Sequence, residues 1–189
     1  MMDIVETIKT RRSARRFKPD KISRELLREI VNLASWAPSD MNTQPWQVTI
    51  LTGRARDKMV KIMSKGIEPL RPLLKKRFPP KIEEATELFF QNMGDAPLIL
   101  IISGDRRDNE IEQKVVIESC SAFVQNLLLI CHSHGLATCW VGSSLHFEKE
   151  VLEYLGKADR VLITNIAIGF AGATNPVPPR KRVELEWIE

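Results

Sequence analysis

The sequence predicts one domain of mixed helix and strand, built around a sheet whose middle strands are covered on both faces. Two continuous apolar runs of strand length, 98–103 and 160–168, lack polar alternation, which is typical of strands buried on both sides. The segment 46–51 does alternate, as a half-buried strand would. Stretches with helical apolar spacing separate these runs. At 189 residues and 43% hydrophobic content, the chain can bury one sizeable core, so we expect a single domain over 1–189.

The composition narrows the class of protein. A formal net charge of +4 at pH 7 is too small for a dedicated nucleic-acid binder, so we expect no nucleic-acid partner. Cys120, Cys131 and Cys139 are odd in number and lack the spacing of a metal or redox pair. We interpret them as reduced, mostly buried thiols of a cytoplasmic protein. The first residues enter a polar helix pattern directly, so no signal peptide is expected.

The most apolar long segment, 115–131, is interrupted by Glu118, Gln125 and Asn126. These polar residues favour a buried helix over a membrane span, so we expect no membrane partner. The helix is predicted to run from about 110 to 133 and to end at Gly135. His132 and His134 lie on its last turn, but a pair without a third ligand is weak evidence for metal, and we expect no metal site.

Four further helices are predicted from caps and periodicity. Asp3 followed by Glu6 has the form of a capping box before a helix near 4–8. Ser23 is a candidate N-cap for the next helix, which Pro38 ends. Its apolar face is Leu26, Leu27, Ile30, Val31, Ala34 and Trp36. Gly53 is predicted to close the first strand, and a third helix follows it and ends near Gly66. A short fourth helix covers 147–155.

Residues 67 to 95 differ from the rest of the chain. Four prolines interrupt a run rich in lysine and arginine, and 83–93 then has a helical pattern. One interpretation is a lid-like excursion over a site, and the other is a plain surface helical hairpin; the sequence favours both equally.

The tail from 174 to 189 is rich in proline and then alternates over 183–188 with a terminal Trp-Ile pair. Proline extends the chain, and the alternation indicates a strand. An isolated exposed strand would aggregate, so we expect this one to pair with the body of the protein or with a second subunit.

A polar loop, 37–46, joins the second helix to the first strand. Pro38 and Pro45 stiffen it, while Asn42 and Gln44 carry amides that can donate and accept hydrogen bonds. Such amides suit the edge of a heteroaromatic ring. An Asx turn, in which Asn42 bonds its own backbone, explains the loop equally well.

Arg11, Arg12, Arg15 and Arg16 fall within six residues at the predicted end of the first helix. Cations there offset the helix dipole, and most basic clusters are solvated surface. Alternatively, guanidinium groups together with the Ser13 hydroxyl form a phosphate clamp. The small-residue turn at Gly142 and Ser143 is either ordinary punctuation after a strand or a place where a ligand approaches backbone N–H groups.

The sequence contains no nucleophile-elbow, HExxH, P-loop or GxGxxG motif, and three histidines are few for acid-base schemes. An enzyme without catalytic side chains takes its chemistry from a cofactor. Arginines at both ends, amides in the central loop and small residues at 142–143 all fit one ligand.

Four motifs resemble the FMN-dependent nitroreductase family, in the order the family has them: RRSARRF (11–17), APSDMNTQPW (37–46), GLATCWVG (135–142) and RKR (180–182). The resemblance implies an α+β fold, with a mostly antiparallel central sheet flanked by helices. It also implies an intertwined homodimer with FMN in the interface, in which the long helix packs across the two-fold axis. Residues 174–189 would form an arm that embraces the partner.

By the same resemblance, Arg11 and Ser13 match phosphate and ribityl contacts, with Arg12 close by. Arg180 and Arg182 would complete the phosphate site from the tail. Arg15 matches a cation near the flavin N1 and O2 edge, where reduction places negative charge.

The remaining matches concern the ring. Pro38, Ser39, Asn42 and Gln44 would line it from the other subunit, and Gly142 and Ser143 would offer backbone N–H groups towards N5. Asn92 is a further candidate, although Phe89 stands where other members carry a polar residue.

The implied activity is ping-pong electron transfer from NADH or NADPH, through tightly bound FMN, to small-molecule acceptors such as nitroaromatics, quinones or free flavin. The excursion at 67–95 would then roof the pocket. An alternative on the same fold is reductive dehalogenation or flavin-consuming chemistry; the deiodinase branch uses a lid tyrosine, whereas Tyr154, the one tyrosine here, lies elsewhere. A non-catalytic FMN or nucleic-acid binding protein is the alternative of a different class.

Overall fold

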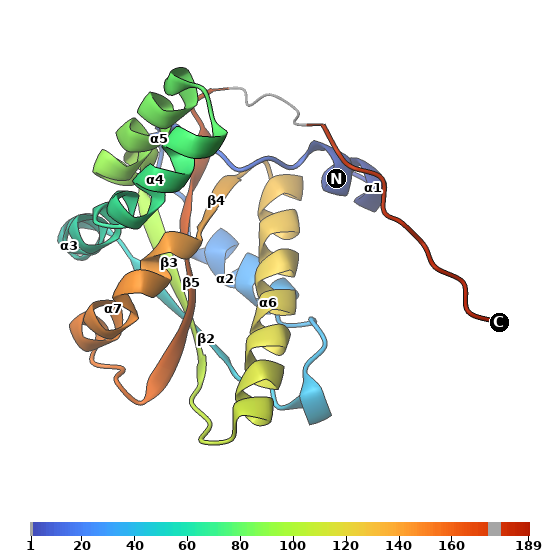
Figure 1. Cartoon of the computed structure of the whole chain (residues 1–189). Helices are drawn as coiled ribbons and strands as arrows, with labels where there is room; N and C mark the ends of the chain where they lie inside the picture. The colour runs from blue at the N-terminus through green and yellow to red at the C-terminus, as the bar shows by residue number, and fades with distance from the viewer. Residues whose placement is uncertain (1, 174–178) are drawn as a thin grey trace.

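The computed structural model describes residues 2–173 and 179–189, and its centre is an antiparallel sheet. The order of its main path is β1 (Phe17–Lys18), β5 (Arg160–Ala171), β3 (Leu98–Asp105) and β2 (Trp46–Leu51), and β4 (Ala137–Val141) also pairs with β5. Every pairing is antiparallel. Helices flank both faces, so the predicted α+β fold is confirmed (Figure 1).

The helices are α1 (Ile4–Thr10), α2 (Arg24–Ala34), α3 (Gly53–Ser64), α4 (Ile67–Arg77), α5 (Pro80–Asn92), α6 (Glu110–Ser133) and α7 (Glu148–Leu155). One face of the sheet is covered by α2 and α6, and the other by α3, α5 and α7 (Figure 1). Each face has its own apolar cluster, and Phe123 of α6, fully buried, stacks its ring on Trp46 of β2 at 5.1 Å. The strands 98–103 and 160–168 are buried on both faces, as their lack of alternation predicted.

The predicted caps are present. The Asp3 carboxylate accepts hydrogen bonds from the N–H groups of Val5 and Glu6, and the Ser23 hydroxyl accepts one from Leu26. Trp36 was expected on the buried face of the second helix, but it is 87% exposed. The prediction was wrong because α2 ends at Ala34, so Trp36 leaves the helical spacing that would have placed it inside.

Helix α6 runs from Glu110 to Ser133, as predicted. Its length, and a mean hydropathy of 1.5 over an 18-residue window, would allow it to cross a membrane. In the structure, however, Phe123, Leu127 and Cys131 are fully buried among sheet and α2 residues. One face of the helix therefore packs into the core, as the sequence predicted, while Ile111 and Ile117 on the helix stay exposed.

The segment 67–95 is a helical hairpin of α4 and α5. The second helix begins at Pro80 and not near Glu83, because a proline fits the first turn of a helix, where its missing N–H has no intrahelical partner. Gly53, expected to close the first strand, is instead the first residue of α3 and has a φ of +50°.

The tail residues 179–189 are extended and form no strand in the single chain. Val183, Leu185, Trp187 and Ile188 are 74–90% exposed. A strand needs the edge of another strand to satisfy its backbone, and the chain's own body does not supply one to this segment. The predicted arm residues 174–178 lie outside the described residues.

Candidate functional site

The arginine segment after α1 lies against strand β4. The Ala14 N–H donates to the Thr138 carbonyl at 2.9 Å, and Ser13 forms a parallel bridge with Thr138. Ala14 is buried, Arg11, Arg12 and Ser13 are half-buried, and Arg15 is exposed. Two backbone contacts thus fix the direction in which the flanking guanidinium groups leave the sheet.

Positive charge from both ends of the chain gathers at Arg11. Burial lowers the pKa of the Arg11 guanidinium, and the charges of Arg12 and then Arg180 lower it further. The charge of Arg180 in the tail therefore affects the pKa of Arg11, although the two residues lie near opposite ends of the sequence. A bound anion would relieve the repulsion among these arginines. Arg182, the other predicted phosphate contact of the tail, is exposed.

Arg12 serves the end of helix α1. Its Nη1 donates to the carbonyls of Lys9 and Arg11, both at 2.7 Å. Within the described part of the chain, its Nε is buried without a hydrogen-bond partner. Nη1 of Arg12 thus stabilises the end of α1, as one interpretation of the basic cluster predicted. Nε of Arg12 stays available to an anion.

Gly94 supports the backbone of Arg15 from the other side. Gly94 has a φ of +63°, and a Cβ at that position would lie 2.4 Å from the Arg15 carbonyl oxygen. Below this segment, burial raises the pKa of the Cys139 thiol to about 11, although the positive charges of Arg15 and Arg11 oppose the rise. Both arginines are therefore near enough to Cys139 of β4 for their charges to act on its thiol.

Asn92, a predicted ring contact, caps the turn that contains Gly94. Its Nδ2 donates to the Asp95 carboxylate at 2.8 Å, and its Oδ1 accepts from the Gly94 N–H at 3.0 Å. Phe89 is buried and packs edge-on against Phe90. The amide of Asn92 is thus engaged locally, and its role towards a ligand stays a prediction.

The small-residue turn follows β4 directly. Gly142 begins a 3₁₀ helix, and the space where its Cβ would stand is open. The Ser143 hydroxyl is buried without a partner among the described residues, and it would lie 2.6 Å from a Cβ at Gly66. The turn therefore presents open backbone at Gly142 and packs tightly against the start of α4 at Ser143.

The central loop takes a shape that neither interpretation from sequence anticipated. Met41, Asn42 and Gln44 have positive φ angles of 46°, 57° and 47°. The Gln44 side-chain amide donates to the Asn42 side-chain oxygen at 3.2 Å, so Asn42 bonds a side chain in place of the backbone bond that defines an Asx turn. Pro38, Asn42 and Gln44 are exposed, and Ser39 is half-buried. Their polar atoms are thus presented outward.

Within one chain the loop does not reach the arginines. The loop is bound to α6 at Ser119, whose hydroxyl accepts from the Asp40 N–H at 3.3 Å. The arginine segment meets the other end of α6, where His132 Nε2 and Thr10 Oγ1 are 2.8 Å apart. From Ser119 to His132 the helix rises roughly 20 Å at 1.5 Å per residue. The structure therefore places Arg11, Arg12, Ser13, Arg15 and Arg180 near the first residues of β4, and Gly142 and Ser143 just beyond its last residue. The central loop lies towards the opposite end of α6 (Figure 1).

Sequence reasoning missed Gly94, Ser119 and the Thr10–His132 contact. Gly94 follows Asn92 and precedes Asp95, a turn composition that marks a special backbone position. Ser119 and His132 carry no local signal, because their partners lie more than seventy residues away in sequence. In the described ranges, 2–173 and 179–189, no cluster of three or more His, Cys, Asp or Glu side chains could hold a metal.

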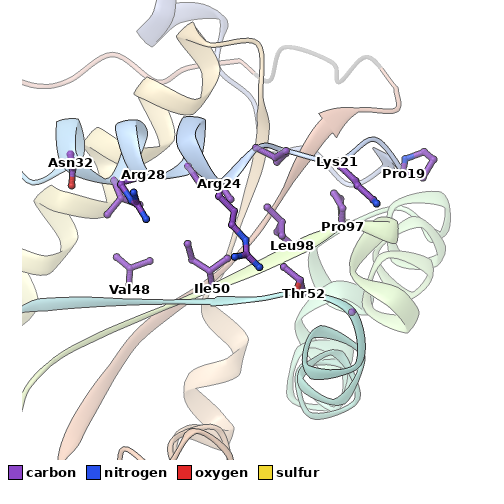
Figure 2. A pocket seen from close by; sticks show the side chains of 14 residues that line it. Pro19, Lys21, Arg24, Arg28, Asn32, Val48, Ile50, Thr52, Pro97 and Leu98 are labelled. Carbon is purple, nitrogen blue, oxygen red and sulfur yellow. The ribbon is translucent and has the colours of Figure 1, made fainter.

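A groove of about 1000 Å³ lies apart from this site, between α2 and the edge strand β2. Figure 2 shows α2 above the strand, with Arg24 and Arg28 reaching down towards Val48 and Ile50. The floor is apolar, and Lys21, Arg24 and Arg28 line the opening. The groove is therefore an apolar channel with a positive rim.

Comparisons with known proteins agree on one family. The Nitroreductase family model matches residues 8–170. A 4-nitrobenzoate reductase of Pseudomonas putida is 27% identical over 89% of this chain and 86% of its own length. Nitroreductase NfnB of Mycolicibacterium smegmatis is 27% identical over 90% of this chain and 83% of its own.

Among solved structures, a nitroreductase with bound FMN from Desulfitobacterium hafniense superimposes with a TM-score of 0.76, at 24% identity and full coverage of both chains. A BluB-like flavoprotein from Clostridium difficile gives 0.77 at 21% identity, again over both whole chains. At these identities the structural likeness establishes the fold alone. Together with the family model, which spans most of the sequence, it shows that this chain belongs to the nitroreductase family, as its four motifs predicted.

Proposed function

We propose that this protein is an FMN-dependent oxidoreductase that passes electrons from NADH or NADPH to a small oxidised acceptor. The observation that carries the proposal is the arrangement on β4. Cationic groups from both ends of the chain meet at Arg11, and an open backbone turn follows the same strand at Gly142.

The residues present fit the phosphate of FMN. Burial and then the positive charges of Arg12 and Arg180 lower the pKa of Arg11, against a smaller opposing effect of Cys139. The buried Arg12 Nε lacks a partner in the described part of the chain. A dianionic phosphate would satisfy both, with the Ser13 hydroxyl as a further donor. We assign this end to Arg11, Arg12, Ser13 and Arg180, with Arg182 completing it from the tail.

The residues also fit the ring. Arg15 projects from the same segment as Arg11, and both act on Cys139 of β4. We propose that its positive charge would lie beside the flavin edge that gains negative charge on reduction. Gly142 and Ser143 follow β4 directly, and we propose that their backbone N–H groups face the ring. Asn92 stays a candidate at the ring edge, where its contact would require the amide to leave Asp95 and Gly94.

FMN held by these residues would supply the redox chemistry that links a reduced nicotinamide to the second substrate. The protein binds and orients the flavin and tunes it with Arg15. We propose a ping-pong order, in which both substrates use one pocket in turn. Nitroaromatics and quinones are the proposed acceptors, in keeping with relatives named as 4-nitrobenzoate, nitrobenzene and chloronitrobenzene reductases.

The hairpin of α4 and α5 stands beside the proposed ring site. Its first residue follows Gly66, which abuts the Ser143 hydroxyl. Phe78 at the turn of the hairpin is 47% exposed. We propose that the hairpin roofs the pocket and selects the acceptor.

The site requires a second copy of the chain. Pro38, Ser39, Asn42 and Gln44 lie at the far end of α6 from the arginines, so they can line a flavin only when they come from a partner. We therefore propose a homodimer with two shared sites.

The tail supplies a means of holding such a dimer together. Strand β2 is an edge of the sheet, and its groove combines an apolar floor with Lys21, Arg24 and Arg28. Residues 183–189 alternate exposed apolar side chains with Glu184, Glu186 and Glu189. We propose that this segment of one copy adds to β2 of the other, where its acids meet the basic rim.

The function is tested on the purified holoprotein. We expect a yellow protein whose flavin absorption bleaches when NADH or NADPH is added without oxygen and returns when a nitroaromatic or quinone is supplied. A protein that stays colourless in excess FMN would refute the proposal. So would affinity for DNA that falls steeply with salt in a colourless protein, which would favour the nucleic-acid alternative.

The arm is tested by charge reversal and sedimentation. The double substitution Arg24→Glu with Arg28→Glu should weaken the dimer, and adding Glu184→Lys and Glu186→Lys should restore it. Reversing Lys75 and Lys76 of α4, which lie outside the groove, is the matched control. If the substitutions at Glu184 and Glu186 do not restore the dimer, the arm does not bind in this groove. A cytoplasmic location stays a prediction, in keeping with three buried free thiols.

A further inference from the structure

The central loop is held in a conformation that it would not adopt alone. Met41, Asn42 and Gln44 all occupy the left-handed region, which is disfavoured for residues with a side chain. Such a conformation persists where surrounding contacts determine it, and it is common at ligand clamps. Inside the loop, the Gln44 N–H donates to the Ser39 hydroxyl at 3.0 Å.

One contact from outside comes from α6. Ser119 is 6% exposed, and its hydroxyl donates to the Val115 carbonyl at 2.8 Å and accepts from the Asp40 N–H at 3.3 Å. A hydroxyl has one hydrogen and two lone pairs, so both bonds form at once. The start of the strained segment is thereby tied to the longest helix.

The other contact comes from β5. Arg160 donates from Nη2 to the Pro45 carbonyl at 2.8 Å and from Nε to the Ser103 hydroxyl at 3.1 Å, and its Nη1 pairs with Asp105 at 3.1 Å. The Asp105 N–H also donates to the Pro45 carbonyl, at 3.2 Å. The end of the loop is therefore tied to two central strands.

We propose that Ser119 and Arg160 are positioning residues that hold the loop 39–44 in the shape in which the amides of Asn42 and Gln44 meet the flavin ring. The inference rests on the proposed function. Both residues belong to rigid elements, and neither was among the residues that the family motifs suggested. Their effect on the flavin passes through the loop, because each contacts loop backbone.

Helix α6 offers a matched pair of variants. Ser121 makes the same bond to the carbonyl four residues earlier, that of Ile117 at 2.7 Å, but it is only half-buried and makes no hydrogen bond to the loop. We expect Ser119→Ala to weaken FMN binding about fivefold, the equivalent of one net hydrogen bond. Ser121→Ala should leave it unchanged. The visible spectrum of bound FMN should shift in Ser119→Ala, because the ring contacts change.

A double-mutant cycle separates positioning from general weakening. With Gln44→Ala already present, Ser119→Ala should weaken FMN binding little further, because both substitutions act through the same loop. With Arg11→Ala present, its cost should be additive, because Arg11 belongs to the other end of the cofactor. Full additivity in both backgrounds would overturn the inference.

Arg160 has its own control in Arg107, which also pairs with Asp105, at 3.2 Å, but does not touch Pro45. Arg160→Gln should weaken FMN binding and shift the flavin spectrum, and Arg107→Gln should do neither. If wild-type protein fails to bind FMN, the proposed function fails. If it binds and Ser119→Ala and Arg160→Gln match their controls, the positioning role alone is wrong.

Discussion

The arginine segment and the central loop are the two halves of the proposed site, and they are built in different ways. Backbone contacts fix the first: Ala14 bonds Thr138, and Gly94 packs on the Arg15 carbonyl. Side chains hold the second from outside, through Ser119 and Arg160, and its own amides stay exposed. In the proposed function, the phosphate half is built from one chain, and the ring-lining half, whose polar atoms are exposed, serves the flavin of a second copy.

The largest expected effect follows from filling the space beneath the arginine segment. Gly94→Ala imposes a left-handed alanine and places its Cβ 2.4 Å from the Arg15 carbonyl oxygen. We expect it to lower the free energy of unfolding by about 3 kcal/mol, from backbone strain together with overpacking. FMN binding should weaken as well, because Arg15 and its neighbours shift. Urea unfolding and FMN titration measure the two effects.

Gly135→Ala is the control for this substitution. Gly135 has a φ of +76°, but nothing lies within 4 Å of the position of its Cβ. Gly135→Ala should therefore lower the free energy of unfolding only by the backbone strain, about 1 kcal/mol. Equal losses at Gly94 and Gly135 would mean that the contact with Arg15 contributes nothing.

The next effect distinguishes two arginines of the same segment. Arg11→Ala should weaken FMN binding about thirtyfold, as expected for loss of about 2 kcal/mol from a hydrogen bond to a charged group. Arg15→Ala should instead lower the flavin potential and slow reduction by NAD(P)H, with a smaller loss of affinity. FMN titration and anaerobic stopped-flow kinetics provide the two measurements. Parallel losses in both variants would contradict the division of roles.

The elements of the fold could be predicted from sequence because their signals are local. Uninterrupted apolar runs identified the buried strands β3 and β5, and the caps at Asp3 and Ser23 identified two helix starts. The prediction that Trp36 is buried was wrong because it extended the helical spacing past Ala34, the last residue of α2. Residues 179–189 form no strand within the described chain, because alternation predicts extended backbone but does not specify a strand edge to pair with.

The candidate site could be predicted only as a set of residues. The motifs named the arginines and the turn at Gly142, and the structure places them along β4. They did not show that Asn92 is engaged in a cap, nor that Ser119 holds the loop. Those facts depend on side-chain contacts that periodicity and spacing do not encode.

The smallest effect concerns pH and the end of α6 that meets the arginines. Burial lowers the pKa of His132 below its ordinary value of 6.5, and Arg11 and Arg12 lower it further, against an opposing effect of Glu6. The unfolded chain therefore binds a proton near pH 6.5, before the folded one does. Apoprotein stability should be constant above that pH and fall as the pH decreases towards the folded pKa, by less than about 1 kcal/mol.

His132→Gln should remove this decrease and retain a hydrogen bond to Thr10. Urea unfolding of the apoprotein at about pH 5.5 and about pH 7.5 measures it, with the exposed His146→Gln as control. Bound FMN should reduce the decrease in the wild type, because its phosphate offsets Arg11 and Arg12. An unchanged decrease in His132→Gln would mean that another group is responsible, and that the arginine cluster does not act on the end of α6.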